Sequence, residues 1–216
     1  MDEVDSGALA DAAFGIFEIL LDKALLAGGM SLHARVEAGI DFLDDFTAVF
    51  DAFAGDYPDL AAALIERFSD PSVIYRLLVE GEGVVPSRTT LRYWIIEDNP
   101  AAGGIDPTGE EAGKWLIFCD AREVDALWHR IRDATANDDL GISAKVSTAK
   151  PNPDSRDERY VIYAYTADWS DEADVMRVRE HLRLLGVEAR IGYKRNLETF
   201  AGEYSEKGKK VTYYSA

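Results

Sequence analysis

The stretch that decides the fold is Gly141-Ile142-Ser143-Ala144-Lys145-Val146-Ser147. Its apolar side chains alternate with polar ones, as the period of two in a half-buried β-strand requires. A second strong strand signal lies at residues 159–166, where valine, isoleucine and tyrosine are concentrated. A polar loop with two prolines separates the two strands. This part of the chain is therefore predicted to form a sheet that turns one face to the core.

Further strands and two helices are predicted around this pair. The strand signals lie at residues 92–98, 114–118, 187–194 and 210–214. Asp120, with Glu123 three residues later, is predicted to cap one helix, and Ser170 to cap the other. Strands outnumber helices and do not alternate strictly with them. We therefore predict an α+β fold, with an antiparallel or mixed sheet that carries two helices on one face.

The first part of the chain has a helical pattern instead. Four helices are predicted, at residues 6–27, 31–55, 57–68 and from residue 71 to about 81. The inward positions of the first are predicted to be Leu9, Ala13, Ile16, Leu20 and Ala24. The segment 81–87, Gly-Glu-Gly-Val-Val-Pro-Ser, is typical of a linker. We predict two domains, an acidic helical region at 1–85 and the α+β domain at 86–216.

The charge of the chain is strongly acidic and unevenly distributed. The formal net charge is −17, of which residues 1–85 carry −13 and residues 86–216 carry −4. This balance argues against affinity of the whole chain for nucleic acid, but it leaves room for a local basic pocket in the second domain. Solubility, or adaptation to high salt as in a halophile, is the simplest explanation of the acidity.

Several classes of protein are disfavoured by the sequence. The N-terminus is acidic, and the longest apolar stretch, 12–21, is short, so neither a targeting signal nor a membrane span is expected. Cys119 is the single cysteine, which excludes an intramolecular disulfide and fits a cytoplasmic protein. The three histidines lack metal-ligand spacing. No metal and no cofactor is therefore predicted.

The predicted sheet has a second face, away from the helices, and basic residues fall on it. If the apolar residues of each strand face the helices, the period of two brings four basic side chains together, namely Lys114, Lys145, Arg190 and Lys194. Aromatic residues predicted to line the edges are Tyr163, Tyr165, Tyr193 and Trp169. Basic groups beside tyrosine hydroxyls suit an anion, especially a phosphate. Solvated surface residues with acidic neighbours are the alternative.

Six segments carry a family resemblance: residues 93–100, 113–118, 143–148, 161–166 with 168–169, 171–175 with 178–179, and 192–194. Together they resemble the basophilic-leukaemia-expressed-protein family, whose archaeal and bacterial members are labelled phosphothreonine lyase domain proteins. The resemblance covers roughly residues 90–216. It implies a fold like that of translation initiation factor 4E, a curved antiparallel sheet with helices on its convex side. The biochemical role of that family is unresolved.

A more distant resemblance is to bacterial phosphothreonine lyases, which remove phosphate by β-elimination. It implies that Lys145 is the base and that Lys114 holds the phosphate, with Arg159 and Tyr165 nearby. Residues 193–196, Tyr-Lys-Arg-Asn, resemble a further binding segment of those enzymes. Leu116 stands where the lyase pattern has the histidine acid, and loss of such an acid costs roughly 10²–10⁴ in rate. The resemblance therefore implies a phosphate pocket more directly than an activity.

Three functions follow from these observations. The first is a binding module for a phosphorylated small molecule, an RNA or a phosphopeptide on the concave face. The second is a phosphothreonine lyase-like enzyme that lacks the usual acid. The third is an interaction protein that acts through residues 1–85, with a protein partner or as a homo-oligomer. The sequence leaves open the ligand, any catalysis, the oligomeric state and the role of residues 1–85.

Overall fold

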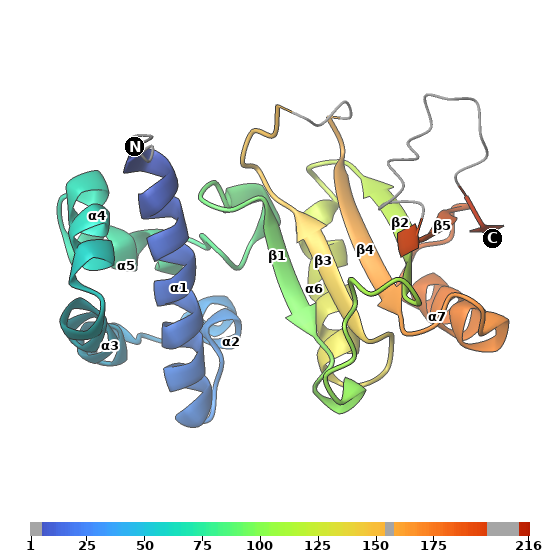
Figure 1. Cartoon of the computed structure of the whole chain (residues 1–216), viewed down its shortest axis with the longest axis horizontal. Coiled ribbons are helices and arrows are strands. Elements are labelled where there is room, and N and C mark those ends of the chain that lie inside the picture. The colour runs from blue at the N-terminus through green and yellow to red at the C-terminus, as the bar shows by residue number, and fades with distance from the viewer. Residues whose placement is uncertain (1–5, 154–157, 198–211) are drawn as a thin grey trace. The chain divides into compact units, whose positions relative to one another are not determined.

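The structure is a computed structural model that describes residues 6–153, 158–197 and 212–216 (Figure 1). The chain divides into two compact units. The helical unit consists of Met1–Tyr93 with Thr148–Pro151, and the sheet unit consists of Trp94–Ser147 with Asn152–Ala216. We retain the division after residue 85 as a proposal for where independently folding domains separate.

The helical unit contains five α-helices where the sequence predicts about four. They are α1 (Ser6–Ala27), α2 (Leu32–Ala38), α3 (Leu43–Asp56), α4 (Pro58–Phe68) and α5 (Pro71–Val79). The predicted helix at 31–55 is divided into α2 and α3, because Gly39 adopts a left-handed conformation and its N–H closes the last turn of α2. Ser31 caps α2 by accepting a hydrogen bond from the N–H of Ala34, as predicted.

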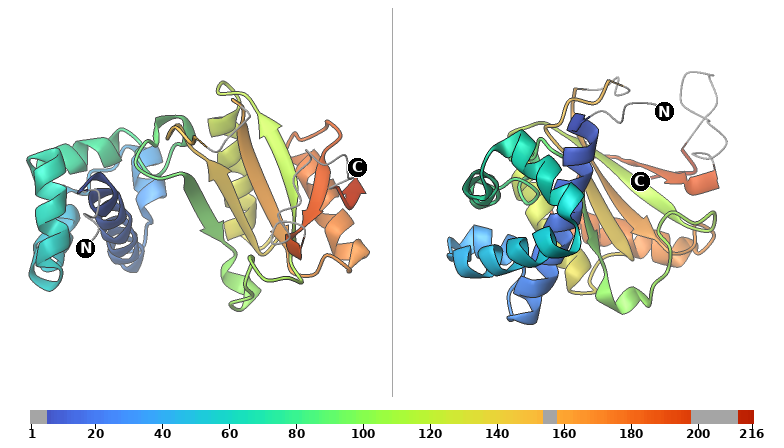
Figure 2. Two further views of the ribbon diagram at one scale, coloured as in Figure 1. Left: turned by 45° about the horizontal axis from the view of Figure 1, so that its top comes forward. Right: turned by 60° about the vertical axis from the view of Figure 1, so that its left-hand side comes forward.

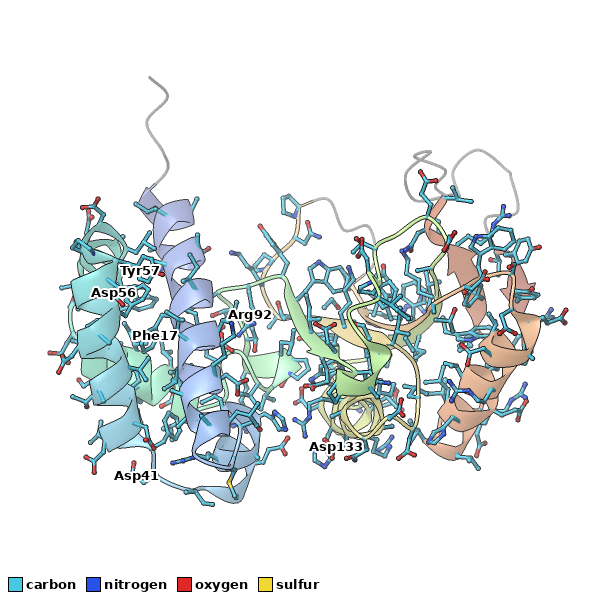
Figure 3. The ribbon with its side chains drawn as sticks, turned by 60° about the horizontal axis from the view of Figure 1, so that its bottom comes forward. Phe17, Asp41, Asp56, Tyr57, Arg92 and Asp133 are labelled. Carbon is cyan, nitrogen blue, oxygen red and sulfur yellow. The ribbon has the colours of Figure 1, made fainter. Side chains whose placement is uncertain are left out.

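Phenylalanine rings form the centre of the helical unit. The ring of Phe17 on α1 contacts those of Phe46, Phe50 and Phe53 on α3, with centroid distances of 5.4–5.5 Å. Figure 3 shows Phe17 on the side of α1 that faces the neighbouring helices. The predicted inward face of α1 is therefore wrong in detail. Ala13 is buried but Leu9 and Ile16 are exposed, since apolar residues occur on nearly all sides of this helix and their spacing alone does not select one.

The segment predicted as a linker is packed into the helical unit. The buried carboxylate of Glu82 accepts hydrogen bonds from the N–H groups of Thr90 and Leu91 and from the Thr90 hydroxyl. Val84 and Leu91 belong to the same apolar core as the phenylalanines. A short 3₁₀ helix, η1 (Pro86–Arg88), lies between them. The glycines of this segment therefore form turns inside the unit, where linker composition alone predicts an exposed connection.

The sheet unit confirms the predicted α+β fold. Six strands pair in the order β1-β3-β4-β2-β5-β6, and every pair is antiparallel. The strands are β1 (Trp94–Asp98), β2 (Gly113–Cys119), β3 (Ser143–Ser147), β4 (Tyr160–Thr166), β5 (Gly192–Arg195) and β6 (Tyr214–Ser215). The helices are α6 (Val124–Ala136), α7 (Glu172–Leu184) and the 3₁₀ helix η2 (Pro100–Ala102).

The two α-helices of the sheet unit lie on one face of the curved sheet, as predicted (Figures 1 and 2). The predicted strand at 187–194 begins only at Gly192. Most of the predicted strand at 210–214 lies outside the described residues, and β6 follows it. In the part of the chain that the structure describes, no helix is both long and apolar enough to cross a membrane.

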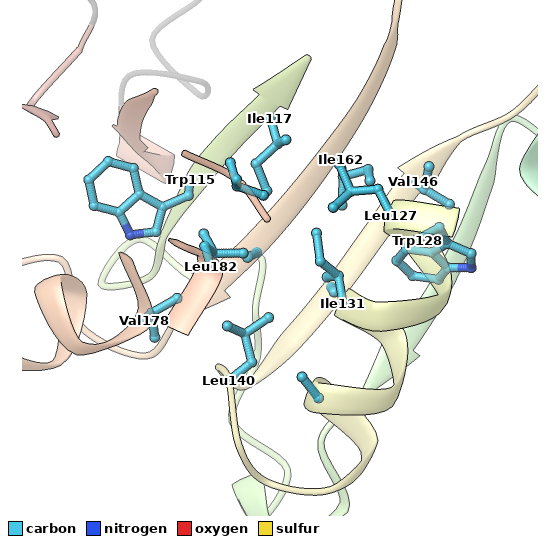
Figure 4. Close-up of a cluster of buried hydrophobic side chains, with 14 of the residues drawn as sticks. Trp115, Ile117, Leu127, Trp128, Ile131, Leu140, Val146, Ile162, Val178 and Leu182 are labelled. Atoms are coloured by element: carbon cyan, nitrogen blue, oxygen red, sulfur yellow. The ribbon is translucent and has the colours of Figure 1, made fainter. Parts of the chain in front are cut away.

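The core of the sheet unit is the layer between the sheet and these helices (Figure 4). It is built from alternate strand residues and from one face of each helix, and includes Trp115, Ile117, Val146, Ile162, Leu127, Trp128, Ile131, Val178 and Leu182. The alternation that buries these strand residues turns their neighbours toward the opposite, helix-free face of the sheet. The sheet thus offers a second surface, whose side chains are not needed to pack the helices.

One charged side chain lies inside this core. Arg179 of α7 is fully buried, and its guanidinium donates hydrogen bonds to the carbonyl oxygens of Val187 (2.8 Å), Ala189 (2.8 Å) and Ala216 (3.1 Å). The guanidinium also lies 5.9 Å from the centre of the Trp115 ring. Arg179 therefore ties α7 to the approach to β5 and to the residue after β6.

Candidate functional site

Strand register brings lysines and tyrosines together on the helix-free face. Lys145 of β3 stands opposite Tyr163 of β4, and Lys114 of β2 stands opposite Tyr165 of β4. Lys194 of β5 stands opposite Lys114. Each of these residues alternates with a neighbour buried under the helices, so their side chains share the other face. The predicted convergence of Lys114, Lys145 and Lys194 on one face is therefore present in the structure.

Lys145 is surrounded by aromatic rings. Its Nζ lies 4.4 Å from the ring centre of Trp94, 5.3 Å from that of Tyr163 and 5.9 Å from that of Tyr165. Burial lowers the pKa of the Lys145 ammonium from its usual value, because the charged form loses water. Within the described residues this ammonium makes ring contacts but no hydrogen bond or ion pair.

Lys114 lies against the same tyrosines and is held by an amide. Its Nζ lies 5.6 Å and 5.5 Å from the ring centres of Tyr163 and Tyr165, and the side chain is only 8% exposed. It donates a hydrogen bond of 2.8 Å to Oδ1 of Asn196. The Asn196 amide nitrogen in turn donates to the carbonyl oxygens of Pro107 (2.9 Å) and Gly109 (2.8 Å), which orients its oxygen toward the lysine.

The rings form a continuous aromatic surface between the two lysines and β1. The centre of the Trp94 ring lies 5.3 Å from that of Tyr163, which in turn lies 6.3 Å from that of Tyr165. Burial raises the pKa of the Tyr165 hydroxyl, which therefore stays protonated and able to donate a hydrogen bond. We call these five residues the aromatic–lysine cluster: Trp94, Lys114, Lys145, Tyr163 and Tyr165.

Two of the predicted site residues lie elsewhere, Tyr193 because it alternates with Lys194 within β5 and Arg190 because it precedes that strand. Tyr193 points to the helix side, where its buried ring packs on Trp115 and its hydroxyl bonds to that of Thr166 at 2.6 Å. Arg190 precedes β5, and its Nε donates to the Ser215 hydroxyl at the β6 edge of the sheet. The prediction that these two residues join the lysines is therefore wrong, through the alternation within β5 for Tyr193 and through the strand boundary for Arg190.

Arg159 and Trp169 are also apart from the cluster. Arg159 directly precedes β4, and its guanidinium lies 4.8 Å from the ring centre of Phe118. By the period of two, Phe118 shares the helix-free face with Leu116 and lies beyond it along β2. Trp169 packs against the sheet core, its ring centre lies 4.8 Å from the Arg195 guanidinium, and it meets the Tyr213 ring edge-on. The rings that these two residues contact are thus different from those of the two lysines.

Two residues of the site were not predicted from the sequence. Trp94 lies in the run 93–96, in which every residue is apolar. The sequence therefore does not indicate which of these residues face the helices, and the pairing of β1 with β3 decides it. The spacing of two between Trp94 and Ile96, which is exposed, with the buried Ile95 between them, is the signal that could have found Trp94. Asn196 falls in the segment 193–196 that the lyase resemblance includes, but its contact with Lys114 depends on the path of the chain after β5, which the strand pattern does not predict.

The chemistry available in the cluster is that of cations, hydroxyls and rings. Leu116 stands opposite Tyr163, so the side chain at the position expected for the acid is on this face and is apolar. The histidines lie on α2, α6 and α7, and not on a strand. Among the described residues there is no group of three or more His, Cys, Asp or Glu that could hold a metal ion.

A comparison with protein-family models covers the middle of the sheet unit and three of its lysines. The matching family is described as basophilic leukemia-expressed protein Bles03. Residues 107–199 match the Bles03 family. The resemblance predicted from the sequence is confirmed over this Bles03-like segment. The segment contains every member of the aromatic–lysine cluster except Trp94, and it also contains Asn196.

Solved structures that resemble this chain include complexes of eIF4E. Schistosome eIF4E complexed with m7GpppG and 4E-BP has 18% sequence identity and a TM-score of 0.39, covering 51% of this chain and 62% of that one. Caenorhabditis elegans eIF4E-3 with the 4E-binding protein Mextli and a cap analog has 17% identity and a TM-score of 0.40, covering 53% and 65%. The chain thus spans less than two thirds of the length of these structures, and what they bind is a property of those proteins.

Proposed function

We propose that the helix-free face of the sheet unit binds a phosphorylated ligand through the aromatic–lysine cluster. The position of Lys145 carries this proposal, because its ammonium lies among three rings and has no ion pair within the described residues. A half-buried cation is stabilised best by an anion, and no carboxylate of the described residues supplies one to Lys145. An external phosphate oxygen would supply that charge. A cytoplasmic location belongs to the same proposal.

The rings favour a nucleotide, or the end of an RNA, over a phosphopeptide. A nucleotide offers both a phosphate for Lys114 and Lys145 and a planar base that can stack on Trp94 or a tyrosine. A phosphothreonine or phosphoserine peptide offers the phosphate without such a base. The net charge of −17 opposes the approach of a long polyanion, so a short ligand whose few phosphates reach the cluster is expected.

Calorimetric titration of the whole chain with nucleoside monophosphates, nucleoside triphosphates and a phosphothreonine peptide tests the proposal. The double variant Lys114→Ala/Lys145→Ala should lose affinity by roughly 100-fold or more, since two charge-assisted contacts are removed. The control Arg122→Ala/Arg183→Ala removes two exposed positive charges of the same unit away from the cluster and should keep wild-type affinity. Equal affinity of both double variants would rule the site out.

A β-eliminating enzyme is the second candidate, favoured by the environment of Lys145. Burial lowers the pKa of this lysine, which is the direction that a proton-accepting lysine needs. Lys145 would take the α-proton of phosphothreonine while the bond from Cβ to the phosphate oxygen breaks, leaving an unsaturated residue and inorganic phosphate. Lys114 would hold the phosphate. Leu116 cannot protonate the leaving group, so the reaction would be slow.

Mass spectrometry of a phosphothreonine peptide incubated with the protein separates the two candidates. An enzyme would convert the peptide to a product lighter by one phosphoric acid, at a rate that Lys145→Ala abolishes. The variant Leu116→His, which puts an acid at the expected position, should increase that rate. Recovery of intact peptide from wild type and from Leu116→His at high protein concentration would exclude β-elimination and leave the binding module.

A further inference from the structure

Helix α1 has an exposed face that is almost entirely apolar. Its large exposed residues are Leu9 (36%), Ile16 (41%), Ile19 (55%) and Leu26 (59%). Among the exposed residues of this helix the single charged side chain is Lys23, and the others are alanines. A solvent-facing helix surface normally carries the charges instead. The face therefore has the composition of an interface.

The carboxylates of α1 are all used on its other sides. Glu18 is buried and forms an ion pair with Arg92. Asp11 forms ion pairs with Arg67 and Lys150, and Asp22 accepts a hydrogen bond of 2.7 Å from the N–H of Leu32. Residues 1–85 carry a net charge of −13, and the exposed face of α1 contributes no carboxylate to it. Two copies of the unit would therefore repel each other little along this face.

The spacing of the four large residues fits a helix pair. From Leu9 to Leu26 the steps are seven, three and seven residues, so all four residues fall at the a and d positions of a heptad repeat. Such positions form the seam between two helices that wind around each other. The steps also read the same in both directions. A two-fold axis between Ile16 and Ile19 would therefore place every large residue opposite another large residue, as an isologous interface requires.

We propose that α1 packs against α1 of a second copy of this chain, antiparallel about that axis. Leu9 then meets Leu26 of the other copy, and Ile16 meets its Ile19. The long side chain of Lys23 meets the small Ala12, which leaves room for its stem. A parallel pair with the same seam would place Lys23 on Lys23, and this like-charge contact disfavours it. The proposal is independent of the ligand proposed for the sheet unit.

Sedimentation velocity of the whole chain over a range of concentrations tests the pairing. Wild type should be a dimer. Ile16→Asp should weaken the dimer by roughly 100-fold or more, because two carboxylates would be buried without partners near the axis. The matched control is Ile65→Asp, which puts the same charge on an equally exposed isoleucine of α4 and should leave the dimer unchanged. Circular dichroism verifies that both variants stay folded.

A charge-pair variant tests the antiparallel register. In Ile16→Lys/Ile19→Asp the proposed axis brings opposite charges together twice, so the dimer should recover by at least about tenfold over Ile16→Asp. A parallel pair would bring like charges together at both positions, and failure to recover would overturn the register. Wild type that is monomeric at every concentration, or a dimer that Ile16→Asp does not weaken more than Ile65→Asp does, would overturn the proposal itself.

Discussion

Replacing Arg179 with methionine should destabilise the sheet unit strongly. The substitution keeps a long side chain against Trp115 but removes the donor to three carbonyl oxygens, those of Val187, Ala189 and Ala216. A hydrogen bond with a charged partner contributes about 1.5–3 kcal/mol. Methionine packs well in the space left, and the carbonyl oxygen of the half-buried Ala216 can partly regain water. We therefore expect the free energy of unfolding to fall by about 4 kcal/mol.

The four tryptophans make this measurement specific. All of them, at positions 94, 115, 128 and 169, belong to the sheet unit, so tryptophan fluorescence in urea follows the unfolding of that unit. With a slope of about 2 kcal/mol per molar urea, the midpoint of Arg179→Met should fall by about 2 M. Arg183→Met, an exposed arginine of the same helix, is the control and should change the free energy by about 0.5 kcal/mol or less. Equal midpoints of the two variants would refute the importance of the three buried hydrogen bonds.

Three further outcomes are expected for the sheet unit. Gly141→Ala should lower its stability by about 2–3 kcal/mol in the same urea assay, because the new Cβ would lie 2.1 Å from the carbonyl oxygen of Tyr165, and an unchanged midpoint would contradict this. The difference in free energy of unfolding between wild type and Lys145→Met should rise with pH, in the range between the lowered pKa of Lys145 in the folded protein and its ordinary value of 10.5. In this range the unfolded chain binds the proton more tightly than the folded one. A difference that does not change with pH would show that burial does not lower this pKa. Burial raises the pKa of the Cys119 thiol to about 11 from 9.0, so a thiol reagent at pH 8 should react about 100-fold more slowly with the native protein than with the unfolded one, and equal rates would refute this.

The strands near the middle of the sheet could be predicted because each has a clear alternation. The pattern around Lys145 indicates which side chains face the helices, and the structure places Lys145 and Lys114 on the same face as expected. Helix α1 was predicted with its bounds, Ser6–Ala27, because two glycines follow it. Its buried face was not, since apolar residues surround the helix and Phe17 finds its partners only through tertiary packing.

The parts of the site that escaped prediction depend on where strands begin and how they pair. Tyr193 and Arg190 were expected beside the lysines, but Tyr193 alternates with Lys194 and faces the helices, and Arg190 lies before Gly192, where pairing with β2 starts. Trp94 takes the helix-free face because β1 pairs with β3 in one register, and a shift of one residue would have turned it to the other side. Such long-range pairings leave no trace in the local sequence.

The amide of Asn196 links two regions that are far apart in the sequence. One end of this side chain accepts a hydrogen bond from Lys114, and the other end donates to Pro107 and Gly109 in the loop before β2. A movement of the lysine toward an occupant of the cluster would pull on that loop through a single rigid group. Amide hydrogen exchange at Gly109 should then report occupancy without a probe in the site itself, and Asn196→Ala should uncouple the two.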